Sequence, residues 1–202
     1  SVPVYWYGKN KAASLFGTGP VFGANAAQMI AWMYHGGGNE FYRELTQDIL
    51  GLDIVGFMGF PMPAQPFGWF KKPIDDVSQV KGLKYRTVGL AADLVPAMER
   101  GVIDAFEFNN PTSDMRFGSQ DVAKNYMLSS YHQASESFEF IFSKRKFESL
   151  PPDLQAVLRY AVEAASTSNY ALAMHQYSQD LEKLQKDHGV TVKRTPESVL
   201  KA

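Results

Sequence analysis

The longest regular pattern of apolar and polar positions lies near the C-terminal end of the chain. Apolar side chains recur at helical spacing from Leu154 to Leu184, Pro151-Pro152-Asp153 precedes them, and Gly189 follows them. Because proline favours the start of a helix and glycine its end, this pattern predicts one helix over about residues 153–188. A helix of that length extends about 50 Å at a rise of 1.5 Å per residue. Part of it is therefore expected to pack on another chain or another domain.

Shorter segments upstream alternate between helical and strand patterns. Asn25 can cap a helix that ends at Gly36. The expected helices cover residues 25–34, 39–50, 91–100 and 121–126, with a single helical turn at 75–80. The expected strands cover residues 2–7, 52–60, 82–86, 101–107, 127–131 and 137–142. Strand, helix and strand in succession predict a parallel sheet, so the fold class is α/β.

Two parts of the pattern bear on domain organisation. Residues 127–131 and 137–142 are typical of crossover strands between two lobes. Residues 87–101 must supply a complete connection between parallel strands, but Pro96 interrupts the helix expected there. Either that helix starts at Pro96, or residues are missing at this junction.

Composition excludes several classes of function. The chain has 202 residues, 45% of them hydrophobic, which is enough for a substantial core in one domain or two small ones. A net charge of -1 with scattered Lys and Arg provides no basic surface for nucleic acid or an anionic membrane. No apolar run approaches the length of about 20 residues that spans a bilayer, and residues 1–4 do not resemble a signal peptide. The absence of cysteine excludes disulfides, thiolate nucleophiles and Cys-ligated metals.

The most informative chemistry lies where two expected strands end. Residues 101–107 form an apolar run that ends on Glu107, followed by Phe108 and Asn109, and residues 82–86 form a short strand that ends on Arg86. Open α/β sheets hold ligands at such strand ends. Arginine binds a carboxylate through two parallel hydrogen bonds. The pattern predicts a site for a small carboxylate, and the alternative for Arg86 is an ordinary structural salt bridge.

Glu107 stands between two phenylalanines, so a buried carboxylate there needs a cation or a network of donors. A metal ion held by oxygens from Glu107, the Gln65 amide and a backbone carbonyl would be Na⁺ or Ca²⁺ rather than zinc. The alternative is a pairing of Glu107 with Arg86 and nothing else. At this point the residues leave both options open.

Catalytic motifs are weakly represented. The four histidines show neither metal-ligand spacing nor a pairing with an acid, and His132 is the one that merits a test. No serine lies in a nucleophile elbow, and Gly36-Gly37-Gly38 lacks the Lys-Ser/Thr of a phosphate loop. The sequence therefore favours a binding protein over an enzyme.

Five stretches, taken in order and spacing, carry a resemblance to a known family. They are Tyr7-Gly8-Lys9-Asn10, residues 32–38 with 41–45, Gln65 with Gly68-Trp69-Phe70, residues 81–86 and residues 97–107. In these stretches the chain resembles the periplasmic solute-binding proteins of tripartite ATP-independent periplasmic (TRAP) transporters, in the branch that takes up 2-oxo acids and related organic acids. The resemblance covers nearly the whole chain.

The resemblance implies a two-lobed periplasmic-binding-protein-like fold that closes on its ligand in a cleft between the lobes. It implies a ligand carboxylate on Arg86, and a cation on Gln65, Glu107 and the backbone of Phe108. Members of this branch can dimerise through the long C-terminal helix. Residues 1–202 would correspond to the C-terminal two-thirds of such a protein, without its N-terminal portion and an internal segment between Leu94 and Val95. Relatives often carry Trp where Phe108 stands, which changes the shape of the pocket.

The resulting hypothesis is a periplasmic receptor that binds a 2-oxo acid or related monocarboxylate and delivers it to the TRAP membrane subunits. It needs no organic cofactor, does not bind nucleic acid, and is expected to be a homodimer with Na⁺, Ca²⁺ or no cation in its site. The residues assigned to the ligand are Arg86, Gln65, Glu107, Phe108, Trp69, Phe67, Tyr7 and Asn109, with Phe22 as a further candidate for the apolar wall. One alternative is a metal-assisted enzyme that uses Glu107 as a base on a carboxylate substrate. Another is a sensor module with the same binding fold.

Overall fold

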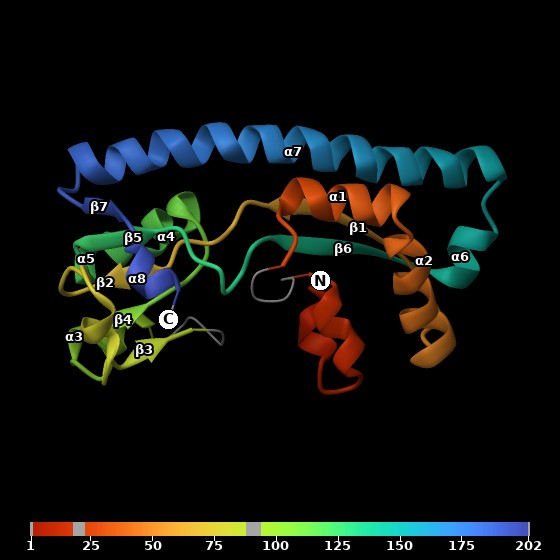
Figure 1. The fold of residues 1–202 in the computed structure, drawn as a ribbon. Coiled ribbons are helices and arrows are strands. Elements are labelled where there is room, and N and C mark those ends of the chain that lie inside the picture. Colours follow the sequence, from red (N-terminus) through yellow and green to blue (C-terminus); the bar gives the residue numbers. More distant parts are fainter. Residues whose placement is uncertain (1, 18–22, 88–93, 202) are drawn as a thin grey trace. The chain divides into compact units, whose positions relative to one another are not determined.

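The computed structural model describes residues 2–17, 23–87 and 94–201. The chain divides into two compact units, and each unit is built from two separate stretches of sequence. The first unit comprises residues 1–64 and 133–173, and the second comprises residues 65–132 and 174–202. Each unit contains strands as well as helices (Figure 1), so the predicted mixed α/β class is confirmed.

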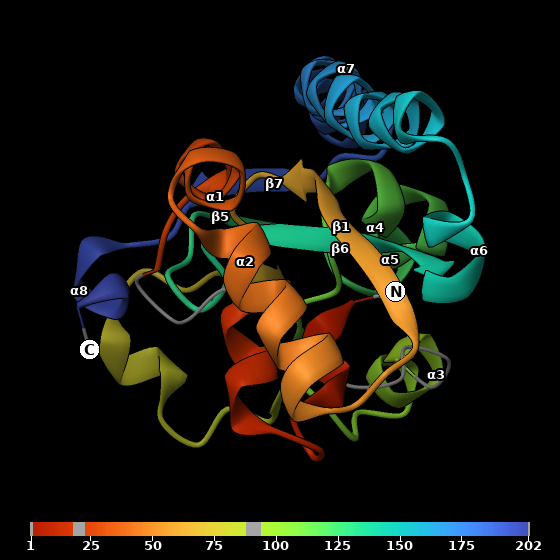
Figure 2. The same cartoon turned by 90° about the vertical axis from the view of Figure 1, so that its right-hand side faces the viewer.

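The first unit contains two consecutive helical segments that pack on one strand. Helix α1 (Ala26–His35) begins with a capping box, in which the Asn25 side chain accepts from the backbone N–H of Gln28 at 3.0 Å and the Gln28 side chain accepts from the Asn25 N–H at 2.9 Å. Helix α2 (Gly38–Arg43) continues into a π-helical segment, η3 (Glu44–Ile49). Helix α1 lies alongside strand β1 in Figure 1, and helix α2, which follows α1 in Figure 2, contacts the same strand. The two predicted helices at 25–34 and 39–50 are therefore confirmed.

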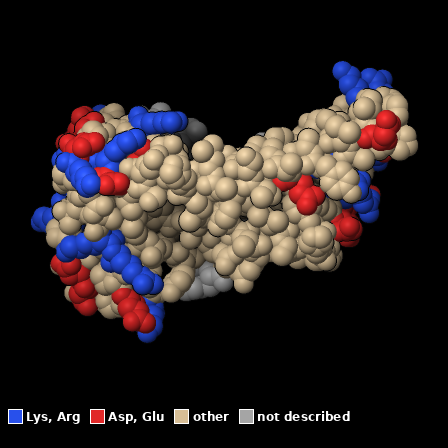
Figure 3. Space-filling view, turned by 90° about the horizontal axis from the view of Figure 1, so that it is seen from above, with Lys and Arg blue, Asp and Glu red and all other residues tan. Residues whose placement is uncertain are grey.

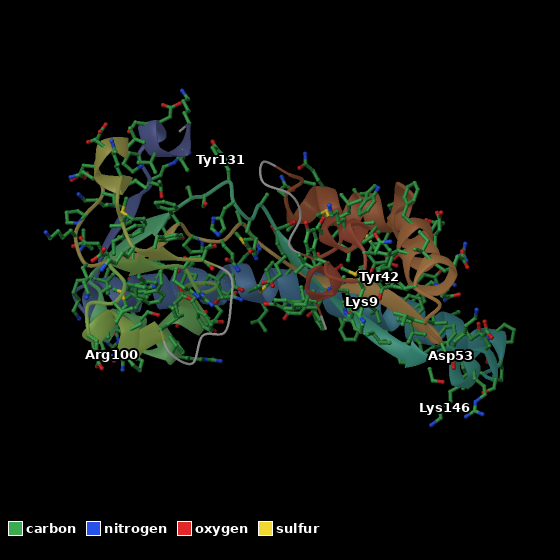
Figure 4. The ribbon with its side chains drawn as sticks, turned by 90° about the horizontal axis from the view of Figure 1, so that it is seen from below. Lys9, Tyr42, Asp53, Arg100, Tyr131 and Lys146 are labelled. Carbon is green, nitrogen blue, oxygen red and sulfur yellow. The ribbon has the colours of Figure 1, made fainter. Side chains whose placement is uncertain are left out.

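The sheet of the first unit has two antiparallel strands, β1 (Ile54–Met62) and β6 (Glu136–Ser143). Their register is interrupted between Gly59 and Met62, where Phe60 has a left-handed φ of +49°. Tyr42 packs edge-on against Phe16 with ring centroids 5.5 Å apart and donates a hydrogen bond to the buried Glu139 of β6. Figure 4 labels Tyr42 among the side chains of this unit. The strands predicted at 52–60 and 137–142 are confirmed.

The strand expected at residues 2–7 is wrong, because these residues form the 3₁₀ helix η1 (Pro3–Trp6). Pro3 stands in its first turn, where its lack of an N–H and its fixed φ favour a helix. The hydrogen bonds are local, from Tyr5 N–H to the Val2 carbonyl at 3.2 Å and from Tyr7 N–H to the Val4 carbonyl at 3.0 Å. A second 3₁₀ helix, η2 (Lys11–Leu15), follows and is capped by the Asn10 side chain.

The second unit contains a five-stranded sheet in the order β3-β4-β2-β5-β7. Its strands are β2 (Gly68–Phe70), β3 (Tyr85–Arg86), β4 (Ala105–Phe106), β5 (Asn125–Leu128) and β7 (Thr191–Arg194). Strands β3 and β4 are parallel, as the strand-helix-strand pattern predicts, and helix α3 (Leu94–Glu99) lies between them in the chain. Strand β2 is antiparallel to both β4 and β5.

The expected helix over 91–100 is partly confirmed, since α3 starts at Leu94 and residues 91–93 lie outside the described residues. Pro96 does not start this helix but stands in its first turn, where a missing N–H costs no intrahelical bond. The helix expected at 121–126 is wrong. Helix α5 (Ser119–Val122) ends early because Asn125 to Leu128 pair with β2 on one side and β7 on the other. The strand expected at 127–131 therefore lies earlier, and its last three residues are not in β5.

Four short elements remain, three in the second unit and one in the first. They are η4 (Val77–Val80), α4 (Pro111–Phe117), α6 (Lys144–Glu148) in the first unit, and α8 (Glu197–Leu200). The core of the second unit centres on Trp69, Phe106 and Tyr126, all fully buried. Trp69 stacks on Tyr126 with ring centroids 4.2 Å apart.

The predicted long helix is confirmed as α7 (Pro152–Lys186), which has 35 residues. It continues without interruption from the first unit into the second. Between Glu163 and Asp180 it carries no Asp, Glu, Lys or Arg, and Figure 3, which looks down on it from above, shows an uncharged stretch there. Leu172 and Met174 in this stretch are 61% and 49% exposed. Among the described helices, including α7, none has the length and apolarity that crossing a membrane requires.

Candidate ligand-binding site

The two charged residues that the sequence singles out lie at the ends of neighbouring parallel strands. Arg86 is the last residue of β3 and pairs in register with Phe106, so Glu107 directly follows β4 at the same edge of the sheet. Arg86 Nη1 donates to the Glu107 carbonyl oxygen at 2.8 Å and lies 3.6 Å from Glu107 Oε1. The Glu107 N–H in turn donates to the Arg86 carbonyl at 3.1 Å. A guanidinium and a carboxylate from separate strands therefore converge at one place.

This pair is well shielded from water, since the side chains of Arg86 and Glu107 are 17% and 5% exposed. A buried carboxylate without a cation would be strongly destabilising, so Arg86 provides the compensation that Glu107 needs. The salt bridge between Arg86 and Glu107, which the sequence analysis gave as one alternative, is thus present. A guanidinium carries five N–H donors, so its contact with Glu107 is compatible with a second carboxylate.

Strand β2 brings a third segment against this pair. Gly68 has a φ of +124°, and a Cβ built on it would lie 2.3 Å from the Phe106 carbonyl oxygen and 3.0 Å from Glu107 Cα. Only glycine allows the backbones of β2 and β4 to approach so closely. Gln65 and Phe67 immediately precede this contact, so the close approach holds their segment beside the end of β4.

Tyr85 links the segment before β2 to β3. Its hydroxyl donates to the Phe67 carbonyl at 2.6 Å, and its ring stacks on Phe67 with centroids 5.5 Å apart. Burial raises the pKa of Tyr85 well above its ordinary value, and the negative charge of Glu107 raises it further. Tyr85 therefore stays a neutral donor at any physiological pH. The sequence analysis missed it, although its position next to Arg86 placed it at the same strand end.

Gln65 has an oxygen without a partner. Its side chain is 5% exposed, and Oε1 is buried with no hydrogen bond in the described structure. Buried amide oxygens are nearly always paired, so an unpaired one suggests an additional ligand. Amide and carboxylate oxygens are the donors that Na⁺ and Ca²⁺ prefer. The residues expected for a cation, Gln65 and Glu107 with the Phe108 carbonyl, fit such an ion in donor chemistry. Across the described residues, this site included, no three His, Asp or Glu side chains group together, so a cation here would depend on amide and carbonyl oxygens as well.

The aromatic residues proposed for the apolar wall differ in exposure. Phe108 is partly buried and stacks on Phe117 with centroids 4.7 Å apart. Phe67 is also partly buried, whereas Trp69 is fully buried and its Nε1–H donates to Asp114 at 2.9 Å. Tyr7 belongs to the first unit and is 53% exposed, and Phe22 lies outside the described residues. Contact of these side chains with a ligand stays a prediction.

Asp114 is a second residue near the site that the sequence analysis missed, and it is buried. It is 1% exposed, and burial raises its pKa to about 6, against the four hydrogen bonds that lower it. Two of these bonds come from the backbone N–H groups of Asn109 and Asn110, directly after the candidate site. Asn110 also caps α4, with Pro111 at its first position. The Asn-Pro pair signals a helix start in the sequence, but it does not show which groups Asp114 meets.

A family model for bacterial extracellular solute-binding proteins, family 7, matches residues 90–202. A monocarboxylate 2-oxoacid-binding periplasmic protein of Nostoc sp. is 29% identical over 178 residues, and the match covers 80% of this chain and 48% of that protein. This chain thus spans about half the length of its curated relative. The resemblance to TRAP solute-binding proteins is confirmed at the level of the family.

Solved structures of TRAP periplasmic solute-binding proteins have the same fold. The protein of Colwellia psychrerythraea, with bound calcium and pyruvate, is 32% identical with a TM-score of 0.86, and the match covers 100% of this chain and 65% of that one. The protein of Pseudoalteromonas atlantica, with bound sodium and pyruvate, is 32% identical with a TM-score of 0.83 and the same coverage. The protein of Bordetella bronchiseptica, a dimer with calcium and picolinate, is 29% identical with a TM-score of 0.84 and coverage of 98% and 62%. The family model matches more than half of this chain, which therefore belongs to the family 7 bacterial extracellular solute-binding proteins.

Proposed function

We propose that this chain is part of a periplasmic TRAP receptor that binds a small 2-oxo acid or related monocarboxylate together with a cation. The observation that carries the proposal is the Arg86–Glu107 pair, 3.6 Å apart at the ends of β3 and β4, together with the unpaired amide oxygen of Gln65 in the same unit. The relatives with similar structures bind pyruvate or picolinate with calcium or sodium. Delivery of the acid to TRAP membrane subunits follows from the family.

Arg86 would bind the ligand carboxylate. The Arg86 side chain lies at a strand end and is only 17% exposed. It is therefore shielded from water, which strengthens a charge-assisted hydrogen bond to a ligand carboxylate. Arginine suits this role because its planar donors match both oxygens of a carboxylate, which a lysine ammonium does not. Glu107 holds the guanidinium in place through the carbonyl contact at 2.8 Å, so Arg86 loses little conformational freedom when the ligand binds.

The cation would be held by Gln65 Oε1, the Glu107 carboxylate and the Phe108 carbonyl oxygen. When bound, it supplies positive charge for the acceptor atoms of the ligand. Pyruvate and picolinate share a chemical feature here, because each carries a second acceptor, a 2-oxo oxygen or a ring nitrogen, next to its carboxylate. A carboxylate with such a neighbouring acceptor is the substrate class that this donor set favours.

Aromatic side chains would set the size of the acid. Phe67 and Phe108 lie on the two segments that meet at Gly68 and Glu107, Phe108 packs against the core cluster that contains Trp69, and Asn109 completes the proposed ligand contacts in this unit. A small apolar wall around a few polar groups is typical of specific ligand sites. The receptor is preferred to a metal-assisted enzyme with Glu107 as base, because the family and the relatives described above are solute-binding proteins.

Isothermal titration calorimetry of the complete protein with pyruvate, with and without CaCl₂, tests this function. Arg86→Ala removes charge-assisted hydrogen bonds of about 1.5–3 kcal/mol, so pyruvate affinity should fall roughly 10- to 100-fold. Arg100→Ala is the matched control, since Arg100 lies in the same unit and is exposed directly after α3 (Figure 4). Unchanged affinity in Arg86→Ala, or consumption of pyruvate seen by NMR on long incubation, would contradict the receptor.

We further propose that the receptor dimerises through α7. The uncharged stretch between Glu163 and Asp180, with Leu172 and Met174 exposed, supports an apolar contact between two copies. The related protein of Bordetella bronchiseptica is described as a dimer. Leu172→Lys with Met174→Lys should convert the dimer to a monomer in sedimentation equilibrium, and a monomeric wild-type protein would overturn the proposal.

A further inference from the structure

One buried carboxylate joins the segments that carry the candidate site. Asp114, on α4, accepts from Trp69 Nε1 at 2.9 Å and from the Tyr126 hydroxyl at 3.0 Å, both at Oδ2. Its other oxygen, Oδ1, accepts from the backbone N–H groups of Asn109 at 3.0 Å and Asn110 at 3.1 Å. The four donors come from β2, β5 and the loop between β4 and α4. Asp114 therefore connects three separate parts of the second unit.

The contacts of Asp114 suit a carboxylate better than an amide. A carboxylate accepts about four hydrogen bonds and donates none, which matches the four donors around Asp114. An asparagine in its place would turn an NH₂ group toward either the Trp69 Nε1–H or the two backbone N–H groups. At least one donor would then be buried without an acceptor, which is costly in a core where Trp69 and Tyr126 are fully buried.

The position of these donors connects Asp114 to the proposed binding residues. Asn109 directly follows Phe108. The hydrogen bonds from the backbone N–H groups of Asn109 and Asn110 to Asp114 therefore hold the backbone in place just after Glu107 and Phe108. Trp69 follows Gly68, the residue at which β2 approaches β4 closely. The hydrogen bond from Trp69 to Asp114 therefore holds the backbone in place just after Gln65 and Phe67. The oxygens of Gln65, Glu107 and Phe108 thus lie on the two segments that Asp114 holds together.

We propose that Asp114 is a positioning residue of the organic-acid site, which fixes the Gln65–Trp69 segment relative to the loop after β4 without touching ligand or cation. This inference rests on the proposed function. A displacement of either segment moves the oxygens that would hold the cation away from Arg86, the anchor of the ligand carboxylate. A site of this kind depends on the residues that support it as much as on those that touch the ligand.

Asp114→Asn in the complete protein tests the inference, with Asp180→Asn as the matched control. Asp180 is 2% exposed in the same unit, and its carboxylate accepts from Thr112, Gln176 and Lys183, none of which lies on the Gln65–Trp69 segment or on the loop after β4. Both variants should lower thermal stability. At a temperature where both are folded by circular dichroism, Asp114→Asn should weaken pyruvate binding in CaCl₂ at least tenfold by calorimetry, and Asp180→Asn should stay within twofold of wild type.

A spectroscopic readout separates positioning from general destabilisation. The indole N–H resonance of Trp69 reports its bond to Asp114, and in wild type it should shift on addition of pyruvate although Trp69 is fully buried. In Asp114→Asn the shift should be lost, and in Asp180→Asn it should be retained. Should Asp114→Asn fail to fold, Tyr126→Phe removes one donor to the same oxygen and should weaken pyruvate binding three- to tenfold.

The two proposals fail differently. If wild type binds no pyruvate with or without CaCl₂, the proposed function is overturned. If wild type binds pyruvate but the folded Asp114→Asn, or Tyr126→Phe in its place, binds it within twofold of wild type, Asp114 is a structural residue only and the positioning role is overturned.

Discussion

Substitution of Gly68 by alanine tests the close approach of β2 and β4 on which the candidate site depends. The added Cβ would lie 2.3 Å from the Phe106 carbonyl oxygen and 2.9 Å from its carbonyl carbon, whereas real Cβ atoms essentially never come within 3.0 Å. These are backbone atoms and cannot rotate away, so β2 must move from β4 by at least about 0.7 Å. The pairing of Trp69 with Phe106 would be disturbed as a result.

The expected cost has two parts. A non-glycine residue at a φ of +124° is strained by about 1–3 kcal/mol, and forcing a methyl group into a packed contact costs about 1–3 kcal/mol more. We therefore expect Gly68→Ala to lower the free energy of unfolding by about 2–6 kcal/mol, a large share of the stability of an ordinary domain. Loss of pyruvate binding should accompany it.

Gly82→Ala is the matched control in the same unit. Gly82 also has a positive φ, +78°, but a Cβ there would meet nothing within 4 Å. Its cost is backbone strain of about 1–2 kcal/mol, offset by about 0.4–1 kcal/mol because alanine restricts the unfolded chain. Urea unfolding followed by circular dichroism, with hydrogen exchange of peptides 66–72 and 104–110, measures both variants. A stability loss in Gly68→Ala no larger than in Gly82→Ala would refute the close approach.

Three further predictions concern stability. Burial raises the pKa of Asp114 in the folded protein to about 6, from 3.8. The contribution of Asp114 to the free energy of unfolding is therefore fully present below about pH 4 and falls by about 3 kcal/mol as the pH rises through 6. Urea midpoints between pH 4 and 7 should show this fall in wild type and not in Asp114→Asn. Ser166→Ala leaves the Phe60 N–H without its acceptor at 3.0 Å and should cost about 1–2 kcal/mol, measured as a lower urea midpoint; no change would mean that this N–H finds another partner. Asn25→Ala removes the cap of α1 and should cost about 1 kcal/mol, with faster amide exchange at Gln28; equal exchange would contradict the capping box.

Local signals in the sequence were reliable where a single segment carries its own determinants. The apolar spacing of residues 154–184 predicts α7 to within two residues at each end, and Asn25 with Gly36 predicts α1. The hydrogen bonds of a helix join residues four apart, so periodicity and caps describe most of what stabilises it. The strand end at Arg86 and Glu107 was also predictable, because both lie in a strand-helix-strand unit, although β4 covers only Ala105–Phe106 of the strand expected over 101–107 and Glu107 directly follows it.

Errors occurred where a distant partner decides the local structure. Residues 123–126 continue a helical pattern from α5, but Asn125 to Leu128 pair with β2 and β7 and form a strand instead. Residues 2–7 have strand-like composition, yet they form a 3₁₀ helix with local hydrogen bonds, and no partner strand pairs with them among the described residues. Composition alone does not provide the neighbour that a strand requires.

The sequence by itself determined helices α1 and α7, the family and the pair of charges at two strand ends, because these depend on spacing within short segments. Only the tertiary structure decided what surrounds that pair. The hydrogen bond between Trp69 and Asp114 joins residues 45 positions apart, and the contact of Gly68 with Phe106 depends on how β2 enters the sheet. Burial of a carboxylate or of an unpaired amide oxygen is a property of the packed chain, since it depends on neighbours that come together only when the chain folds.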